Sequence, residues 1–207
     1  MRRWLIDPMP MNKSKSLEYD LRYLQAALEL LERYLLSDDI FWPVGATPPD
    51  GEPDYPQMTL DGVLLARARL SARPKTTDQQ DQVGKVTSDL DYQRSRHRVA
   101  WERKAHECYR VRLRMWGDFL QEYRDNPGDN ADRYAYEVRL RVMLDLLKPE
   151  VGLQNAAEAQ LLNGLDKMLK GVLINDGFIW DEEIKAGFPR DEYWYLYGSL
   201  PRLAKNR

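Results

Sequence analysis

Residues 17–36 read LEYDLRYLQAALELLERYLL, and this stretch decides the fold. Its leucines alternate at spacings of four and three residues: Leu17, Leu21, Leu24, Leu28, Leu31 and Leu35. Because an α-helix has about 3.6 residues per turn, this spacing places them on one face. Three tyrosines and Leu30 add a second apolar flank, which predicts a helix packed on more than one side. Ser16 precedes the stretch and is expected to cap it.

A second stretch repeats the end of this helix at an offset of 138 residues. Residues 35–42 read LLSDDIFW, and residues 173–180 read LINDGFIW. We therefore expect a single helical domain over 1–207, built from two related helix-plus-aromatic-loop units and a central helical hairpin. The units span about 16–69 and 154–207, and the hairpin spans about 88–148. Duplication and coincidence are both open as the origin of the repeat.

The segments after the first helix extend an all-α prediction. Residues 37–58 contain five prolines, which lack the amide donors that helices and strands need, so a long surface loop is expected there. Thr59 is expected to cap a short helix that ends at Ala72. The C-terminal tail is rich in aromatic residues and predicts one more short helix. Together these segments predict a compact bundle of about five to six helices.

Two longer helical regions follow the short helix. The first is expected from about residue 77 to 124, with a break near Gly84 or Ser88, because glycine and serine weaken a helix interior. The second is expected over 155–174, where Gly177 suits the left-handed position that follows a helix end.

A β-hairpin is an alternative structure for residues 109–115 and 136–142. Both alternate apolar and charged residues, which is the period of a β-strand, and they resemble each other enough to pair as a hairpin. The surrounding residues keep helical periodicity, and all twelve prolines fall outside the expected helices. We therefore favour helices here, including one from Asn130 to about Lys148, with the hairpin as the alternative.

Composition narrows the class of protein. The chain has 207 residues, 43% of them hydrophobic, and a formal net charge of -2, which argues against general attraction to nucleic acid or anionic membranes. Charge is uneven, however: residues 34–66 carry a local net of -6, and residues 94–114 carry +6. The single cysteine, Cys108, excludes an internal disulfide. No apolar run long enough to span a bilayer is present, so a cytoplasmic protein that binds no membrane is expected.

Four aromatic side chains in the repeated loops are candidates for binding a protein partner: Phe41, Trp42, Phe178 and Trp180. Exposed aromatic residues commonly anchor protein interfaces. The alternative is that they close the ends of the helical bundle as part of its core, which is the more frequent position for a tryptophan beside isoleucine and phenylalanine.

An arginine stripe is the second candidate surface. Helical spacing places four arginines on one side of the 77–124 region: Arg96, Arg103, Arg110 and Arg114. These side chains could follow a phosphate backbone, or they could pair with acidic loops of the same chain. Arg94, Arg98 and Arg112 fall on the apolar side instead. A guanidinium there needs a carboxylate or backbone oxygens, and we expect Arg112 at least to be paired.

Asp38, Asp39 and Asp176 lie just beyond expected helix carboxyl ends, where negative charge opposes the helix dipole. These aspartates are therefore candidates for binding a cation or a basic partner. The alternative is that their side chains form hydrogen bonds with their own backbone. His97 and His106 are on nearly opposite helix faces and cannot share a metal. The best hypothesis is a non-enzymatic helical protein-interaction module that binds a protein partner or itself, without cofactor or metal. A nucleic-acid-associated protein is the alternative, and a carboxylate- or metal-dependent enzyme is the second alternative.

Overall fold

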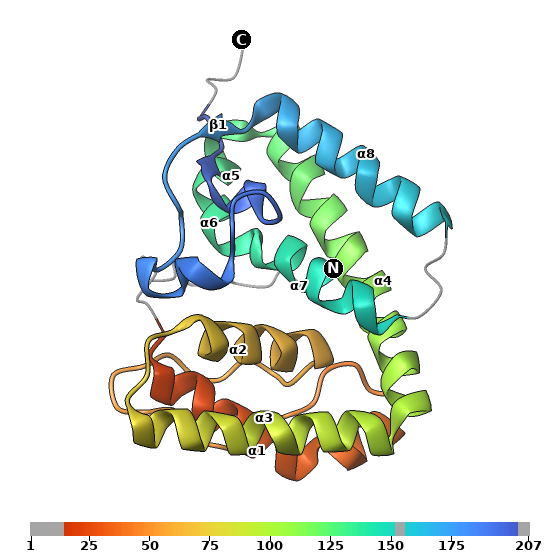
Figure 1. The fold of residues 1–207 in the computed structure, drawn as a ribbon. Helices are drawn as coiled ribbons and strands as arrows, with labels where there is room; N and C mark the ends of the chain where they lie inside the picture. Colours follow the sequence, from red (N-terminus) through yellow and green to blue (C-terminus); the bar gives the residue numbers. More distant parts are fainter. Residues whose placement is uncertain (1–14, 152–155, 203–207) are drawn as a thin grey trace.

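The computed structural model describes residues 15–151 and 156–202 and confirms an all-α fold. In these ranges it contains eight α-helices, and the bounds are α1 Leu17–Leu36, α2 Leu60–Ala72, α3 Thr77–Arg96, α4 Arg98–Asp125, α5 Pro127–Asn130, α6 Tyr134–Glu137, α7 Arg139–Leu147 and α8 Ala156–Val172. Figure 1 shows α1, α2 and α3 stacked in one part of the molecule, with α4 rising from the end of α3 toward α8.

The expected starts of the first two helices are confirmed. The Ser16 hydroxyl accepts a hydrogen bond from the Tyr19 amide at 3.1 Å, and the Thr59 hydroxyl accepts one from the Gly62 amide at 3.1 Å. Each cap satisfies an amide that has no partner inside its helix. The leucine face of α1 is buried as its spacing predicts, with Leu24, Leu31 and Leu35 almost inaccessible to solvent.

The break in the 77–124 region is not where the sequence placed it. α3 runs through Gly84 and Ser88 without interruption and ends at His97, whose backbone leaves helical geometry at φ -111° and ψ 32°. A glycine costs a helix only about 1 kcal/mol, and the buried Val83 and Val86 hold α3 in place around it. The break therefore follows from packing rather than from helix propensity.

The helical alternative is correct for both alternating stretches. Residues 109–115 lie inside α4, and residues 136–142 fall in α6 and α7. The helix expected over 130–148 is nevertheless divided, by the 3₁₀ turn η1 Ala131–Arg133 and by Val138, which separates α6 from α7.

The loop over residues 37–58 is extended as expected and is closed by one antiparallel bridge between Trp42 and Met58. Gly45 and Gly51 have φ of 68° and 80°, and they are the positive-φ residues of the described chain. These turns favour glycine because a β-carbon is strained there. Gly177 does not have this conformation, so the expected left-handed position is wrong; α8 ends earlier, at Val172.

The C-terminal segment wraps back over the bundle. It contains β1 Ile174–Asn175, the 3₁₀ helices η3 Glu182–Gly187 and η4 Trp194–Leu196, and β2 Gly198–Ser199, which pairs antiparallel with β1. Gly187 allows η3 to approach α2 closely, because a β-carbon there would overlap Ala72. α2 lies at the centre of the molecule and packs against α1, α3, α4, α7 and η3.

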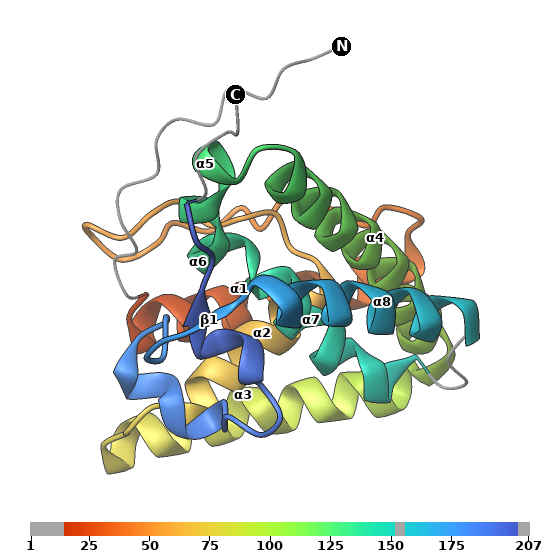
Figure 2. The same cartoon turned by 90° about the horizontal axis from the view of Figure 1, so that it is seen from above.

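α8 has the opposite environment. It packs mainly against α4, and Figure 2 shows it crossing over α4 at the outside of the molecule. None of the helices in the described ranges is long and apolar enough to cross a membrane.

Candidate interaction surfaces

Phe41 is the most exposed of the four aromatic candidates. Its side chain is 43% exposed, and its ring lies 5.5 Å from the Arg112 guanidinium. Trp42 beside it is half-buried and meets Tyr34 edge-on at 6.4 Å between ring centroids. The bridge to Met58 fixes the backbone of this loop, with amide–carbonyl distances of 3.0 and 2.7 Å. An aromatic side chain is thus presented from a restrained loop.

The aromatic pair in the second loop is more enclosed. Phe178 is 8% exposed and packs against Tyr197 at 5.2 Å between ring centroids. The Trp180 indole is half-buried, donates to the Ala135 carbonyl at 3.1 Å, and meets Phe188 edge-on. This loop therefore presents less aromatic surface than the loop that carries Phe41.

Arg112, next to Phe41, has the carboxylate partner that the sequence required. Its guanidinium donates to Asp61 at 2.5 Å and to the Thr59 hydroxyl at 3.1 Å, and all three residues are buried. A buried pair of this kind is costly to break, because removal of one member leaves an uncompensated charge. Arg94 and Arg98 are instead exposed and pair with Glu150 and Glu102.

The carboxyl end of α1 receives its cations from within the chain. The Lys104 ammonium, completely buried, donates to the carbonyls of Ser37 and Asp39 at 2.8 and 2.9 Å. Arg103 donates to the Leu35 carbonyl at 3.1 Å and lies 3.9 Å from the Asp38 carboxylate. Positive charge at a helix carboxyl end complements the helix dipole. Lys104 and Arg103 of α4 thus bind the backbone carbonyls at this helix end, and the Asp38 carboxylate lies at its exposed edge.

The arginine stripe is divided by these contacts. Arg103 is engaged with the end of α1, and Arg110 lies 3.8 Å from Glu158 of α8. Arg96 and Arg114 are exposed and have no ion pair among residues 15–151 and 156–202. Only Arg103 of the stripe therefore lies near a carboxylate of the acidic 34–66 segment, whereas the neighbour of Arg110 belongs to α8.

The acidic candidates do not come together as ligands. Asp38 is fully exposed beside Arg103, and the Asp176 carboxylate accepts from the Gly177 amide at 2.8 Å. Within the part of the chain that the structure describes, no three histidine, cysteine or carboxylate side chains are grouped to hold a metal. Burial raises the pKa of the Cys108 thiol to about 12, with the Asp61 carboxylate adding to the effect, so this thiol is protonated and unreactive at neutral pH.

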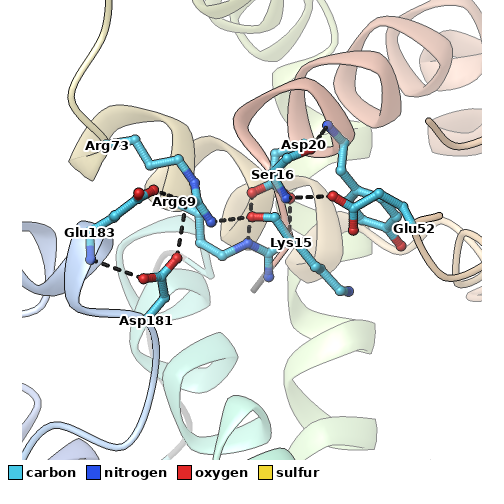
Figure 3. Close-up of polar contacts among 9 residues, drawn as sticks. Lys15, Ser16, Asp20, Glu52, Arg69, Arg73, Asp181 and Glu183 are labelled. Carbon is cyan, nitrogen blue, oxygen red and sulfur yellow. Dashed lines mark hydrogen bonds and ion pairs between the residues drawn. The ribbon is translucent and has the colours of Figure 1, made fainter. Parts of the chain in front are cut away.

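An ionic cluster that the sequence did not reveal joins α1, α2 and η3 (Figure 3). Arg69 of α2 forms a bidentate pair with the completely buried Asp20 of α1. One turn later, Arg73 binds Asp181 at 3.2 Å, Glu183 at 2.9 Å and the backbone carbonyl of residue 15. Arg73 thus ties the C-terminal segment to α2, while Arg69 ties α2 to α1.

A groove between α4 and α8 was also missed. It is an open depression of about 370 Å³, and its apolar lining residues include Leu113, Leu161 and Leu165. Leu161 stands at its edge and is 54% exposed. The spacing of these residues was visible in the sequence, but nothing there showed that α8 would cover α4 only in part.

Comparisons of the chain with protein-family models, with curated proteins and with solved structures find no match.

Proposed function

We propose that the chain is a cytoplasmic, non-enzymatic protein-interaction module, with the loop of Phe41 and Trp42 as its partner-binding surface. The observation that carries the proposal is the exposure of Phe41 on a loop whose backbone is fixed on both sides, by the Trp42–Met58 bridge and by the Tyr34 hydroxyl, which donates to the Ile40 carbonyl. A rigid aromatic side chain loses little conformational freedom on binding, and aromatic and arginine side chains are enriched where interfaces are strongest.

The surroundings of Phe41 support this role. Arg112 lies under its ring, held by a buried carboxylate, so the aromatic side chain has a firm base. Leu36, 62% exposed, and Asp38, fully exposed, lie nearby in sequence. Phe41 is thus an apolar anchor directly beside a guanidinium, and aromatic and arginine side chains are both enriched in protein interfaces. Phe178 and Trp180 enter the proposal as a second, smaller surface.

The proposal is tested by photo-crosslinking followed by affinity measurement. A photoreactive phenylalanine analogue is placed at position 41 and, as the control, at Val99, which is 82% exposed on α4. A discrete adduct is expected from position 41 and not from position 99. The protein that is crosslinked to position 41 is then purified on its own. Its affinity for the wild-type chain and for Phe41→Ala is measured by calorimetry.

We expect Phe41→Ala to weaken binding by about 2 kcal/mol, or about thirtyfold, while Val99→Ala leaves affinity unchanged. The melting temperature of Phe41→Ala should stay close to wild type because the side chain is partly exposed. Equal adducts from both positions, or an affinity that Phe41→Ala does not change, would contradict the proposal.

A further inference from the structure

Two aspartates stand next to Phe41 and keep their negative charge exposed. Lys104 is completely buried and donates to two backbone carbonyls at 2.8 and 2.9 Å, and Arg103 donates to a third at 3.1 Å. The Arg103 guanidinium lies 3.9 Å from the carboxylate of Asp38, which is fully exposed. Asp39 is exposed and forms no ion pair within residues 15–151 and 156–202. The cations of α4 thus bind backbone oxygens at this helix end, and the charges of both aspartates face solvent.

Both carboxylates are within reach of a segment that contacts Phe41. Asp39 and Asp38 precede Phe41 by two and three residues, and an extended chain of that length spans at most about 7 and 11 Å. Lysine and arginine carry their charge at the end of a long apolar stem. One partner segment can therefore pack on the ring and also place a cation against the carboxylates.

The backbone that carries these three side chains is held in place. The Tyr34 hydroxyl donates to the Ile40 carbonyl at 3.1 Å, and Trp42 pairs with Met58 through two hydrogen bonds. A backbone that is ordered before binding loses little conformational freedom when a partner binds. The positions from which the ring and the two carboxylates project are therefore set in the free protein.

The rest of the loop has the same sign of charge. Residues 37–58 contain five carboxylates and no lysine, arginine or histidine. Asp50 and Asp54 are exposed, and neither forms an ion pair with any residue that the structure describes. The guanidinium beside the Phe41 ring belongs to a buried ion pair and adds no net charge. The loop therefore repels nucleic acid and other polyanions and attracts a positively charged protein segment.

We propose that the Phe41 surface binds a basic segment of a partner protein. A lysine or arginine of the partner pairs with the carboxylates of Asp38 and Asp39, and an adjacent apolar side chain packs on the Phe41 ring. This partner chemistry rests on the proposed function of the same surface. The charges select the partner and speed its association, while the aromatic anchor supplies affinity.

Three short fluorescein-labelled peptides test this on the purified full chain. They share the same apolar residues and differ only at their polar positions, which are all lysine, all serine or all glutamate. Fluorescence anisotropy measures their affinity at low and at physiological salt. At low salt the lysine peptide should bind at least about tenfold more tightly than the serine peptide, and the glutamate peptide should bind most weakly. The advantage of lysine should shrink as salt rises, because salt screens exposed charges.

Variants of the chain assign the effect to this surface. Asp38→Asn/Asp39→Asn should weaken the lysine peptide about tenfold at low salt and leave the serine peptide unchanged. Asp81→Asn/Asp89→Asn is the matched control: it removes two exposed carboxylates of α3 that form no ion pair among the described residues, and affinity should not change. Phe41→Ala should weaken both peptides, because packing on the ring does not depend on charge. Circular dichroism shows that each variant is folded.

The possible outcomes distinguish this partner chemistry from the proposed function. A lysine peptide that does not bind the wild type, or that binds no better than the serine peptide, overturns the basic partner. Equal losses in the two aspartate variants would show attraction to the chain as a whole, which also overturns it. If Phe41→Ala weakens binding and Asp38→Asn/Asp39→Asn does not, the surface binds a partner that is not basic. If only the aspartates matter, the ring is not the anchor and the proposed function fails.

Two further results would replace the basic segment by another occupant. A single-stranded oligonucleotide that binds more tightly than the lysine peptide in the same assay would identify a surface for anions. Weaker binding of the lysine peptide at higher concentrations of the chain would identify a second copy of the chain on this surface.

Discussion

α1 and α8 share leucines at two positions 138 residues apart, and the molecule encloses the two helices to different degrees. α1 has nine buried residues and lies against α2, α3 and α4, whereas α8 has two, Leu162 and Leu169, and lies mainly on α4. Both buried leucines of α8 correspond, at the 138-residue offset, to buried leucines of α1. The shared leucines lie on the side of each helix that packs against the rest of the molecule. How many further residues are buried depends on the number of neighbouring helices.

The two helices are also anchored differently. α1 is fixed by the buried Asp20 and by Lys104 at its carboxyl end. α8 is held by Asp166, whose carboxylate accepts two hydrogen bonds from Arg141 at 2.8 and 2.9 Å, and by Glu158 near Arg110. A helix with one covered side keeps its other side for contacts outside the chain.

The largest effect is expected from the anchor of α1. Asp20→Ala leaves the Arg69 guanidinium, whose side chain is 15% exposed, without its carboxylate, and should lower the free energy of unfolding by about 3–5 kcal/mol. Urea denaturation followed by circular dichroism measures the change. Glu18→Ala breaks the exposed pair with Arg22 and should cost less than about 0.5 kcal/mol. Similar costs for both substitutions would show that the buried pair does not anchor α1.

The next largest effect on stability is expected from two leucines at equivalent positions in α1 and α8. Leu31 in α1 and Leu169 in α8 are both completely buried and occupy equivalent positions. Leu31→Ala should cost about 3–5 kcal/mol, because neighbours on several sides prevent collapse of the cavity. Leu169→Ala should cost about 2 kcal/mol, since α8 can move toward α4. Equal losses in urea denaturation would remove the difference between the two helices.

Alkaline pH should lower the stability of the molecule through tyrosines in α1. Burial is the main cause that raises the pKa of Tyr19, Tyr23 and Tyr34 above the ordinary value of 10.0, and α8 contains no tyrosine. The unfolded chain loses these phenolic protons above pH 10 while the folded chain keeps them, so the stability that the three tyrosines contribute is constant below pH 10 and falls above it. At pH 11 each tyrosine should cost about 1.4 kcal/mol. Urea denaturation at pH 9 and pH 11 measures the free energy of unfolding, and an unchanged value would contradict this.

The smallest effect is expected from the replacement of a glycine inside α8. Gly164 lies in the middle of α8, and a β-carbon there would meet no atom within 4 Å. Gly164→Ala should stabilise α8 by about 0.5–1 kcal/mol through helix propensity alone. The gain should be seen as slower hydrogen exchange of α8 amides. No change in their exchange would show that α8 opens only when the whole molecule unfolds.

Regular periodicity made most of the fold predictable. The leucine spacing and caps of α1 and the proline-rich loop are local features, and the structure agrees with them. The break at His97 was not predictable from glycine content, because it depends on which helices α3 and α4 meet. Residue 138 interrupts an apolar helical pattern for a similar reason: packing rather than propensity sets the ends of α6 and α7.

The candidate surfaces were predictable only in part. A guanidinium on an apolar face required a partner, which predicted pairing of Arg112 but not the identity of Asp61. Lys104 was missed because a lysine on an arginine-rich helix is ordinarily solvated, and only the fold shows the carbonyls at the end of α1 that bury it. The Arg69–Asp20 and Arg73–Asp181 pairs join distant segments, and no local pattern in one sequence specifies such pairings.

The most direct test of whether α8 is held less tightly than α1 is native-state hydrogen exchange. It is read by mass spectrometry for both helices in the same sample. The measurement is made at a concentration where the chain is monomeric, so that association does not protect either helix. We predict that the buried amides of α1 exchange only through global unfolding and those of α8 through a local opening of clearly lower free energy. Equal opening free energies in the two helices would contradict the account.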